Sequence, residues 1–387
     1  MSARRAATGP LGRHLRDAGV VICAGSGGVG KTTTSAAIAL GLAARGQRVA
    51  VVTIDPAKRL ADALGVDELQ GEPTLVDPAR FAAAGVPISG ELWAMTLDTK
   101  RTFDELIETL APDERSRQDI LGNRIYQQLS GAIAGSQEFT AVAKLYELHA
   151  SGRFDVLVLD TPPSRNALDF LDAPDRLTAF FDGRALRLLL APTGIAGRAL
   201  GRGTGLVLGA LRRLTGADLL TDLSVFFGAL GGIVDGLRER ADSVRALLSD
   251  PRTTFLVVTS PEREPVEEAI FFTAKLRDAG MPFGGLIVNR VHDLLAGVGE
   301  HPAPEDVAAE LEAELGPALA RKVLRTYAEA LELARRDAAA IEHLRAQTHP
   351  GLVVLIPELD QDVHDAAGLA AVHAHLFPVA PGRGATT

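Results

Sequence analysis

The chain has 387 residues, of which 47% are hydrophobic and 23% are charged, and its formal net charge is -9. Such a composition is ordinary for a globular protein, and the acidic balance argues against a nucleic-acid binder. Its single cysteine, Cys23, excludes an internal disulfide and a multi-thiolate metal centre built from one chain. Because no window approaches the roughly 18 apolar residues of a spanning helix, we expect a cytoplasmic protein without transmembrane segments.

Strands and helices alternate along the chain in the predicted secondary structure. The predicted strands are Val20–Cys23, Arg48–Ile54, Leu92–Leu97, Phe154–Leu159, Thr253–Thr259, Phe283–Val288 and Leu352–Ile356. The predicted helical stretches are Ser35–Ala43, 99–150, 172–250, Pro265–Asp278, 302–347 with a break at Gly316-Pro317, and Val363–Leu376. This alternation predicts an α/β fold with a doubly wound, mostly parallel sheet covered by helices on both faces.

The helical stretches divide the predicted organisation into a core and an inserted subdomain. We assign 15–100, 151–172 and 251–378 to the α/β core, 101–150 and 173–250 to a helical subdomain, and 1–14 and 379–387 to flexible tails. The stretch 173–250 is unusually apolar, with leucine, alanine, glycine and phenylalanine between arginines. It forms either a subdomain that buries its own faces or an apolar groove that receives a partner.

A glycine-rich loop organises the chain, because it stands between a predicted strand and a predicted helix. In this context backbone N–H groups turn inward and the helix N-terminus adds partial positive charge, which suits a phosphate group. The loop fits the Walker A spacing, in which the lysine reaches the β- and γ-phosphates and the threonine hydroxyl binds Mg²⁺. Its predicted nucleotide-binding residues are Gly25, Ser26, Gly27, Gly28, Val29, Gly30, Lys31, Thr32 and Thr33.

The glycines of this loop alone do not decide between two kinds of nucleotide site. Gly25, Gly27 and Gly30 also match the dinucleotide-binding fingerprint. A Rossmann loop, however, does not require a lysine ammonium and a threonine hydroxyl directly after its last glycine. Lys31 and Thr32 therefore favour a nucleoside triphosphate.

Two acidic residues end predicted strands of the core. Asp55 follows the strand ending at Ile54, and Asp160 follows the strand ending at Leu159. Ligands collect at the carboxyl ends of strands in open α/β sheets, and phosphoryl hydrolysis needs groups there that orient water and hold a metal. A strand-end aspartate can instead cap the following helix. Two such residues beside a Walker A loop favour roles for Asp55 and Asp160 in Mg²⁺ binding and catalysis.

Four motifs in order carry a resemblance to a known family. Besides the loop Ser26–Thr33, they are Asp55–Gly65, Asp160–Pro163 and Val288-Asn289-Arg290. Together they resemble the ArsA-type P-loop ATPases, which include arsenical pump-driving ATPases and ATPases that target tail-anchored membrane proteins. That family is similar in fold to MinD, ParA and the nitrogenase iron protein. The resemblance spans nearly the whole chain.

The resemblance implies a dimer that opens and closes with ATP and Mg²⁺. It implies that Asp55 activates the attacking water, that Asp160 lies near Mg²⁺ with Thr32, and that Lys31 acts on the phosphates. It further implies that Asn289 reads adenine beside Arg290, with Pro357 near the base. The helical insertion would match the family's client-binding subdomain, with a protein client that is membrane-associated in some members.

Three departures limit what the resemblance implies. The family's signature lysine, which reaches the partner's nucleotide, is replaced by Ser26, so a homodimer would lack that charge at both sites. Because paired ArsA-like ATPases of actinobacteria resemble this chain, we predict a heterodimer with a lysine-bearing paralogue. A lone Cys23 makes the arsenite or anion efflux alternative unfavourable, since arsenite prefers thiolates. The methionines Met1, Met95 and Met281 all lie outside the apolar insertion, which weakens a methionine-rich client groove.

Three functional hypotheses remain from the sequence. The first is a Mg-dependent ATPase whose dimer moves or holds a client, and the second is a regulatory subunit that binds ATP and hydrolyses it slowly or not at all. The third is a small-molecule kinase, for which no acceptor motif is visible. Lys58 and Arg59 either lie exposed or neutralise phosphate charge. The histidines His364, His373 and His375 lack a carboxylate partner at zinc spacing, so we expect no metal there.

Overall fold

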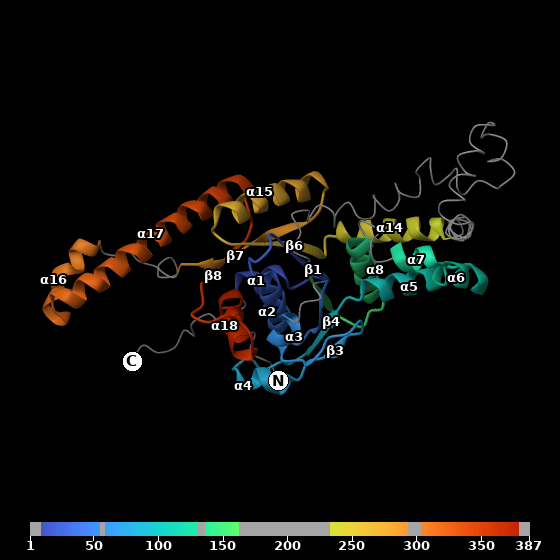
Figure 1. Cartoon of the computed structure of the whole chain (residues 1–387), viewed down its shortest axis with the longest axis horizontal. Helices are drawn as coiled ribbons and strands as arrows, with labels where there is room; N and C mark the ends of the chain where they lie inside the picture. Colours follow the sequence, from blue (N-terminus) through green and yellow to red (C-terminus); the bar gives the residue numbers. More distant parts are fainter. Residues whose placement is uncertain (1–8, 55–58, 130–135, 162–232, 293–302, 379–387) are drawn as a thin grey trace, which may run out of the picture. The chain divides into compact units, whose positions relative to one another are not determined.

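The computed structural model describes residues 9–54, 59–129, 136–161, 233–292 and 303–378 (Figure 1). The chain forms two compact units. The first comprises Met1–Thr96, Gly152–Ala167 and Asp250–Thr387, and the second comprises Leu97–Ser151 and Leu168–Ser249. Residues 1–8 of the predicted tail 1–14, the predicted tail 379–387 and residues 173–232 of the predicted insertion 173–250 lie outside the described residues.

An eight-stranded sheet forms the first unit, in the order β3-β4-β2-β5-β1-β6-β7-β8. Its strands are β1 (Val20–Ala24), β2 (Arg48–Thr53), β3 (Thr74–Leu75), β4 (Glu91–Thr96), β5 (Val156–Asp160), β6 (Thr253–Thr259), β7 (Phe283–Val291) and β8 (Val353–Pro357). Of the strand pairs in the described part of the chain, only the edge pair β3–β4 is antiparallel. The predicted α/β fold with a mostly parallel sheet is confirmed.

The central strands are buried along their whole length because helices cover both faces of the sheet. All residues of β1, β5 and β6 are buried, as expected for parallel strands of continuous apolar sequence. Helices α2 (Lys31–Ala43) and α18 (Ala366–Leu376) pack together on one face, and α15 (Arg263–Asp278) covers β6 and β7 on the other (Figure 1). Successive side chains of β1 therefore point into different cores; Val21 and Cys23 pack towards α2.

The remaining helices of the first unit complete its surface. They are α1 (Pro10–His14), α3 (Arg59–Leu64), α4 (Pro78–Ala83), α16 (Pro304–Leu315) and α17 (Pro317–Thr348). The predicted break between the last two is observed: Gly316 has φ +74°, which glycine tolerates, and Pro317 begins α17. Helices α3 and α4 and strand β3 were not predicted, since each is a short element with little periodicity.

The predicted flexible tail 1–14 is wrong for its last residues. Pro10–His14 form α1, and Leu11 and Leu15 are fully buried in the core beneath α2. Arginines in this segment suggested a solvated tail, but burial of two leucines stabilises the helix by roughly 1.5–3 kcal/mol for each side chain. Residues 9–15 therefore belong to the folded core.

The described part of the second unit is helical. It contains α5 (Thr99–Leu110), α6 (Glu114–Leu121), α7 (Arg124–Leu129), α8 (Ser136–Ala150) and α14 (Val234–Leu248). Asp98 caps the N-terminus of α5, because its carboxylate accepts a hydrogen bond from the Arg101 backbone N–H, and the helix buries Phe103 and Ile107. The Phe103 ring stacks on Tyr126 at 6.2 Å between centroids.

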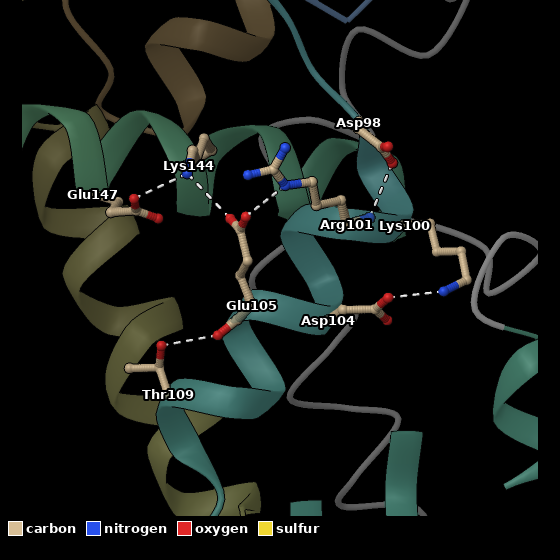
Figure 2. A network of polar contacts seen from close by, with 8 residues as sticks. All are labelled: Asp98, Lys100, Arg101, Asp104, Glu105, Thr109, Lys144 and Glu147. Atoms are coloured by element: carbon tan, nitrogen blue, oxygen red, sulfur yellow. Dashed lines mark hydrogen bonds and ion pairs between the residues drawn. The ribbon is translucent and has the colours of Figure 1, made fainter. Parts of the chain in front are cut away.

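A network of charged side chains joins α5 to α8 within the second unit (Figure 2). The ammonium of Lys144, which is only 5% exposed, contacts Glu147 at 2.9 Å and Glu105 at 3.2 Å. Burial by itself would lower the pKa of Lys144, but the hydrogen bonds and charges of both glutamates outweigh it and raise that pKa. Arg101 adds a second cation to Glu105 at 2.9 Å. The buried lysine is therefore charged and neutralised in place.

Within the described residues, no helix combines the length and apolar character needed to cross a membrane.

Candidate nucleotide-binding site

The glycine loop lies between β1 and α2, and its shape explains why glycines are needed. Gly25, Gly28 and Gly30 have φ of +153°, +79° and +90°. A Cβ at Gly25 would lie 1.9 Å from the carbonyl oxygen of Val258, and one at Gly30 would lie 2.3 Å from the Asn289 amide nitrogen. The loop is thus pressed between β6 and the end of β7, and larger residues do not fit at these two glycines.

Lys31 opens α2 and is buried, with 6% of its surface exposed. Its ammonium donates a hydrogen bond to the carbonyl oxygen of Ser26 at 2.7 Å. The side chain therefore curls over the loop that precedes it, and its charge adds to the partial positive charge of the α2 N-terminus. Ser26 is itself buried, so the position of the family's signature lysine holds a small, enclosed side chain.

Asp160 ends β5 with only 1% of its surface exposed, and threonine hydroxyls hold its carboxylate. Its Oδ2 accepts hydrogen bonds from Thr32 Oγ1 at 2.7 Å and from Thr53 Oγ1 at 2.9 Å. The strand register brings Asp160 and Thr53 together, because Asp160 of β5 is paired with Thr53 of β2 on one side and with Cys23 of β1 on the other. A hydroxyl and a carboxylate oxygen are ligands that Mg²⁺ prefers, so Thr32 and Asp160 fit this ion.

The segment after Asp160 is fastened to β1. Thr161 donates from Oγ1 to the carbonyl oxygen of Cys23 at 2.9 Å. Cys23 is fully buried, and burial raises the pKa of its thiol to about 12. A thiol that stays protonated is a poor ligand for arsenite or a metal.

Asn289 contacts the phosphate loop directly. Its amide donates to the carbonyl oxygen of Val29 at 2.9 Å, across 260 positions of sequence. The pairing of β7 with β8 is irregular between Val288 and Val291, and Arg290 adopts φ +60°, a left-handed conformation that is rare for a residue other than glycine. The predicted strand to Val288 therefore continues as a bulge that turns Asn289 towards the loop, a contact that the sequence did not predict.

These elements surround a cavity of about 680 Å³. The residues of the sequence-predicted site that line it are Gly28, Gly30, Lys31, Thr32, Thr33, Asn289, Arg290 and Pro357. Residues that line it without having been assigned to the site are Arg59, Asp62, Thr161, Glu358, Leu359, Gln361, Asp362, Val363, His364 and Val372, together with Thr34. Most of them follow β8 in the sequence. Their closeness to Pro357, which was assigned to the site, is the only feature of the sequence that could have indicated that they line the cavity.

Other predicted site residues lie around this cavity without lining it. Gly25, Ser26, Gly27 and Val29 form the back of the loop, and Asp160 lies behind Thr32. Asp55 and Lys58 lie outside the described residues, so the expected catalytic and metal-binding role of Asp55 stays a prediction. Thr53, two residues before Asp55, marks where β2 reaches the site.

The histidine cluster shows no metal-ligand arrangement. No group of three histidine, cysteine or acidic side chains suited to a metal occurs among the residues that the structure describes. Burial and the nearby charge of Arg45 lower the pKa of His373 to about 4, so its ring is neutral at pH 7. His364 lies at the cavity instead, with its Nε2 3.9 Å from Asp362 in an exposed pair.

A family model and several known ATPases are similar to this chain. Residues 18–202 match the family described as anion-transporting ATPase. The ATPase ARSA2 of Chlamydomonas reinhardtii is 28% identical over 274 residues, which cover 70% of this chain and 67% of that protein. The ATPase GET3 of Mycosarcoma maydis is 29% identical over 241 residues, covering 62% of each protein.

An actinobacterial protein matches a longer part of the chain. The uncharacterized protein SCO2128 of Streptomyces coelicolor is 29% identical over 325 residues, which cover 84% of this chain and 71% of that protein. The chain thus spans about two thirds of the length of these relatives. Together with the loop, the parallel sheet and the Thr32–Asp160 contact, these matches support an ArsA-like family of P-loop ATPases for this chain.

Proposed function

We propose that the chain binds ATP with Mg²⁺ in the 680 Å³ cavity and hydrolyses it. The observation that carries this proposal is the hydrogen bond of 2.7 Å between Thr32 and Asp160 beside Lys31. Lys31 and the α2 N-terminus would bind the phosphates, and Asn289, Arg290 and Pro357 would lie towards the base. Mg²⁺, held by Thr32 with Asp160, supplies neutralisation of phosphate charge when it is bound.

One further residue of the cavity wall fits this assignment, and the family resemblance adds another. Arg59 brings a guanidinium to the same cavity as Lys31, which suits a polyanion. Asp55 would orient the attacking water, as the family resemblance implies. The net result is transfer of the γ-phosphoryl group to water, with Asp55 accepting the proton that the water loses.

Isothermal titration calorimetry with ATP, with and without Mg²⁺, tests the binding. We expect heat of binding that depends on Mg²⁺ and is lost in Lys31→Ala. Lys322→Ala on α17 serves as a matched control, because this lysine is exposed and does not line the cavity. Absence of Mg-dependent binding in the unmodified chain would contradict the proposal.

We further propose that the chain acts in the cytoplasm as a nucleotide-driven dimeric switch, as a heterodimer with a paralogue that keeps the signature lysine. Ser26 supports this pairing, since a hydroxyl cannot replace a cation at the partner's nucleotide. The client would be a protein that is bound or released as the dimer opens and closes. The variant Asp55→Asn would bind ATP without hydrolysing it, so it could be used to isolate the client in a pull-down experiment.

The pairing is tested by ATPase assays of the chain alone, of the mixture and of Ser26→Lys. Loss of a trans-acting cation costs orders of magnitude in turnover in related systems, so we expect Ser26→Lys alone to gain at least roughly tenfold. Ser26→Met is the control, because it adds length without charge. Full activity of the unmodified chain alone would contradict the heterodimer.

Ser26 also favours a second candidate, a regulatory subunit that binds ATP without fast hydrolysis. Single-turnover hydrolysis separates the two functions. If the mixture with the paralogue hydrolyses only the ATP bound to the paralogue, this chain is the regulatory subunit; if both nucleotides are hydrolysed, it is an active subunit.

A further inference from the structure

Helices α16 and α17 pack against each other as a hairpin (Figure 1), and this hairpin carries exposed apolar side chains. Among the described residues, the exposed large hydrophobic side chains are Leu75, Phe271, Leu315, Leu319, Val323 and Leu333. The last four belong to this hairpin, and Leu319 is 49% exposed. Exposed apolar side chains that gather in one place mark an interaction surface more often than scattered ones do.

The exposed apolar side chains on α17 have the spacing of a coiled-coil seam. Leu319, Val323, Thr326, Ala330 and Leu333 follow one another at alternating intervals of four and three residues. This is the a and d pattern of heptads, which places all five side chains in one line along the helix. In the second half of α17 the protein itself buries this same face, because Asp337, Ile341 and Leu344 lie about five helical turns beyond Leu319, Val323 and Thr326. Up to Leu333 the face is not covered, and Leu319, Val323 and Leu333 are exposed. The seam is therefore available to a second helix.

The charges beside the seam match a second copy of the same helix in antiparallel orientation. In such a pair an a position faces a d position, so Val323 faces Thr326 of the second copy and Leu319 faces its Ala330. This register places Lys322 opposite Glu329 of the second copy. Because a twofold axis relates the two helices, the same ion pair forms a second time with the roles exchanged.

Glu329 is free to exchange partners in this way. Within its own helix it pairs with Arg325 at 3.1 Å, and both side chains are mostly exposed to solvent. Such exposed pairs contribute little, about 0–1 kcal/mol, so their rearrangement costs little.

We propose that the α17 seam pairs with the seam of a second copy of this chain in antiparallel orientation. The seam is short, and an interface of this length falls below the standard size of about 1,600 Å², so the dimer will depend on concentration. No residue of α16 or α17 lines the cavity. The contact is consequently separate from the ATP site, and it goes beyond the proposed function.

Sedimentation velocity of the full chain without nucleotide, over a wide range of concentrations, tests the contact. We expect a monomer–dimer equilibrium. Lys322→Glu and Glu329→Lys each create two like-charge contacts and should raise the dimer Kd by roughly tenfold or more. The double variant K322E/E329K restores opposite charges and should return to within about threefold of the unmodified chain. Val323→Asp should raise the Kd at least as much as the single charge changes, because it buries an unpaired charge.

The control is the double exchange E342K/R345E, which swaps an exposed pair on another face of α17. It should leave the Kd unchanged. A chain that stays monomeric, a dimer whose Kd does not respond to Val323→Asp and Lys322→Glu, or a double charge variant as weak as the single ones would each overturn the proposal. Because nucleotide is absent, none of these results depends on the ATP site.

Discussion

The two units of the molecule each bury a charged side chain, but they hold it in different ways. In the first unit, the carboxylate of Asp160 accepts hydrogen bonds from the hydroxyls of Thr32 and Thr53. In the second, the ammonium of Lys144 donates to the carboxylates of Glu105 and Glu147 (Figure 2). Hydroxyl groups orient a carboxylate without cancelling its charge, whereas two carboxylates neutralise a lysine completely. The first arrangement suits an ion that comes and goes, and the second suits a permanent contact between helices.

The largest expected effect comes from Asp160→Asn. An amide keeps the shape but removes the negative charge that we assign to Mg²⁺, so ATP turnover should fall by roughly a hundredfold or more while the thermal midpoint stays close to that of the unmodified chain. Steady-state hydrolysis over a range of Mg²⁺ concentrations measures this. Asp155→Asn is the control: it lies just before the same strand, in an exposed pair with Arg48, and should leave turnover unchanged. Equal losses in both variants would mean a structural role for Asp160.

Removing the buried lysine tests the other half of the comparison. Lys144→Met leaves Glu105 and Glu147 without their shared cation, and because both glutamates reach solvent we expect a loss of only about 1–2 kcal/mol in the free energy of unfolding. Chemical denaturation measures the change. Lys100→Met, in the exposed pair with Asp104, should cost less than about 0.5 kcal/mol. A Lys144 variant as stable as the Lys100 variant would show that the network contributes nothing.

Thr53→Val asks whether orientation of Asp160 matters. The substitution keeps the size and removes one hydroxyl donor, so turnover should fall by roughly fivefold, with a higher requirement for Mg²⁺ as the distinguishing result. Thr254→Val changes a buried threonine near the amino end of β6, whereas the site lies at the carboxyl ends of the strands; it provides the comparison and should leave the Mg²⁺ requirement unaltered. A fall in stability alone, without a change in the Mg²⁺ requirement, would contradict a positioning role for Thr53.

The smallest effects should appear as opposite responses of stability to pH. The pKa of His373 in the first unit is lowered from 6.5 to about 4. Between these pH values the unfolded chain binds a proton at this residue and the folded chain does not, so the free energy of unfolding declines as the pH falls from 6.5 towards 4. The pKa of Lys144 in the second unit is raised, so its contribution is present below 10.5 and is lost as the pH rises through the folded value. The free energy of unfolding, measured across pH, should no longer decline at acidic pH in His373→Gln and should no longer decline at alkaline pH in Lys144→Met. If either pH dependence persists in the variant that lacks the residue, other groups cause it.

The sequence predicted the sheet better than it predicted the contacts at the sheet's edge. Strands such as Thr253–Thr259 are continuous apolar runs, and the structure has this one at the predicted bounds. The contact of Asn289 with Val29 depends on a bulge and on a left-handed Arg290, neither of which has a local signal when the residue is not glycine. Tertiary geometry alone reveals such contacts.

The helical unit shows the same limit. The amphipathic start of α5 was visible as a pattern, but nothing in the sequence marks Lys144 as buried among acids rather than exposed on α8. Similarly, the arginines around α1 led to the prediction of an exposed tail, although Leu11 and Leu15 are buried by their packing in the core. Charge in a segment predicts solvent exposure poorly where long side chains can reach out from a buried backbone.

The bulge at the end of β7 ties two distant parts of the first unit together through a few consecutive residues. Asn289 holds the Val29 carbonyl, and three positions later His292 contacts Asp337 through both its backbone N–H, at 2.9 Å, and its ring Nδ1, at 2.7 Å. Asp337 lies in the second half of α17. The segment from Asn289 to His292 therefore links the glycine loop to the second half of α17, with a hydrogen bond at each end.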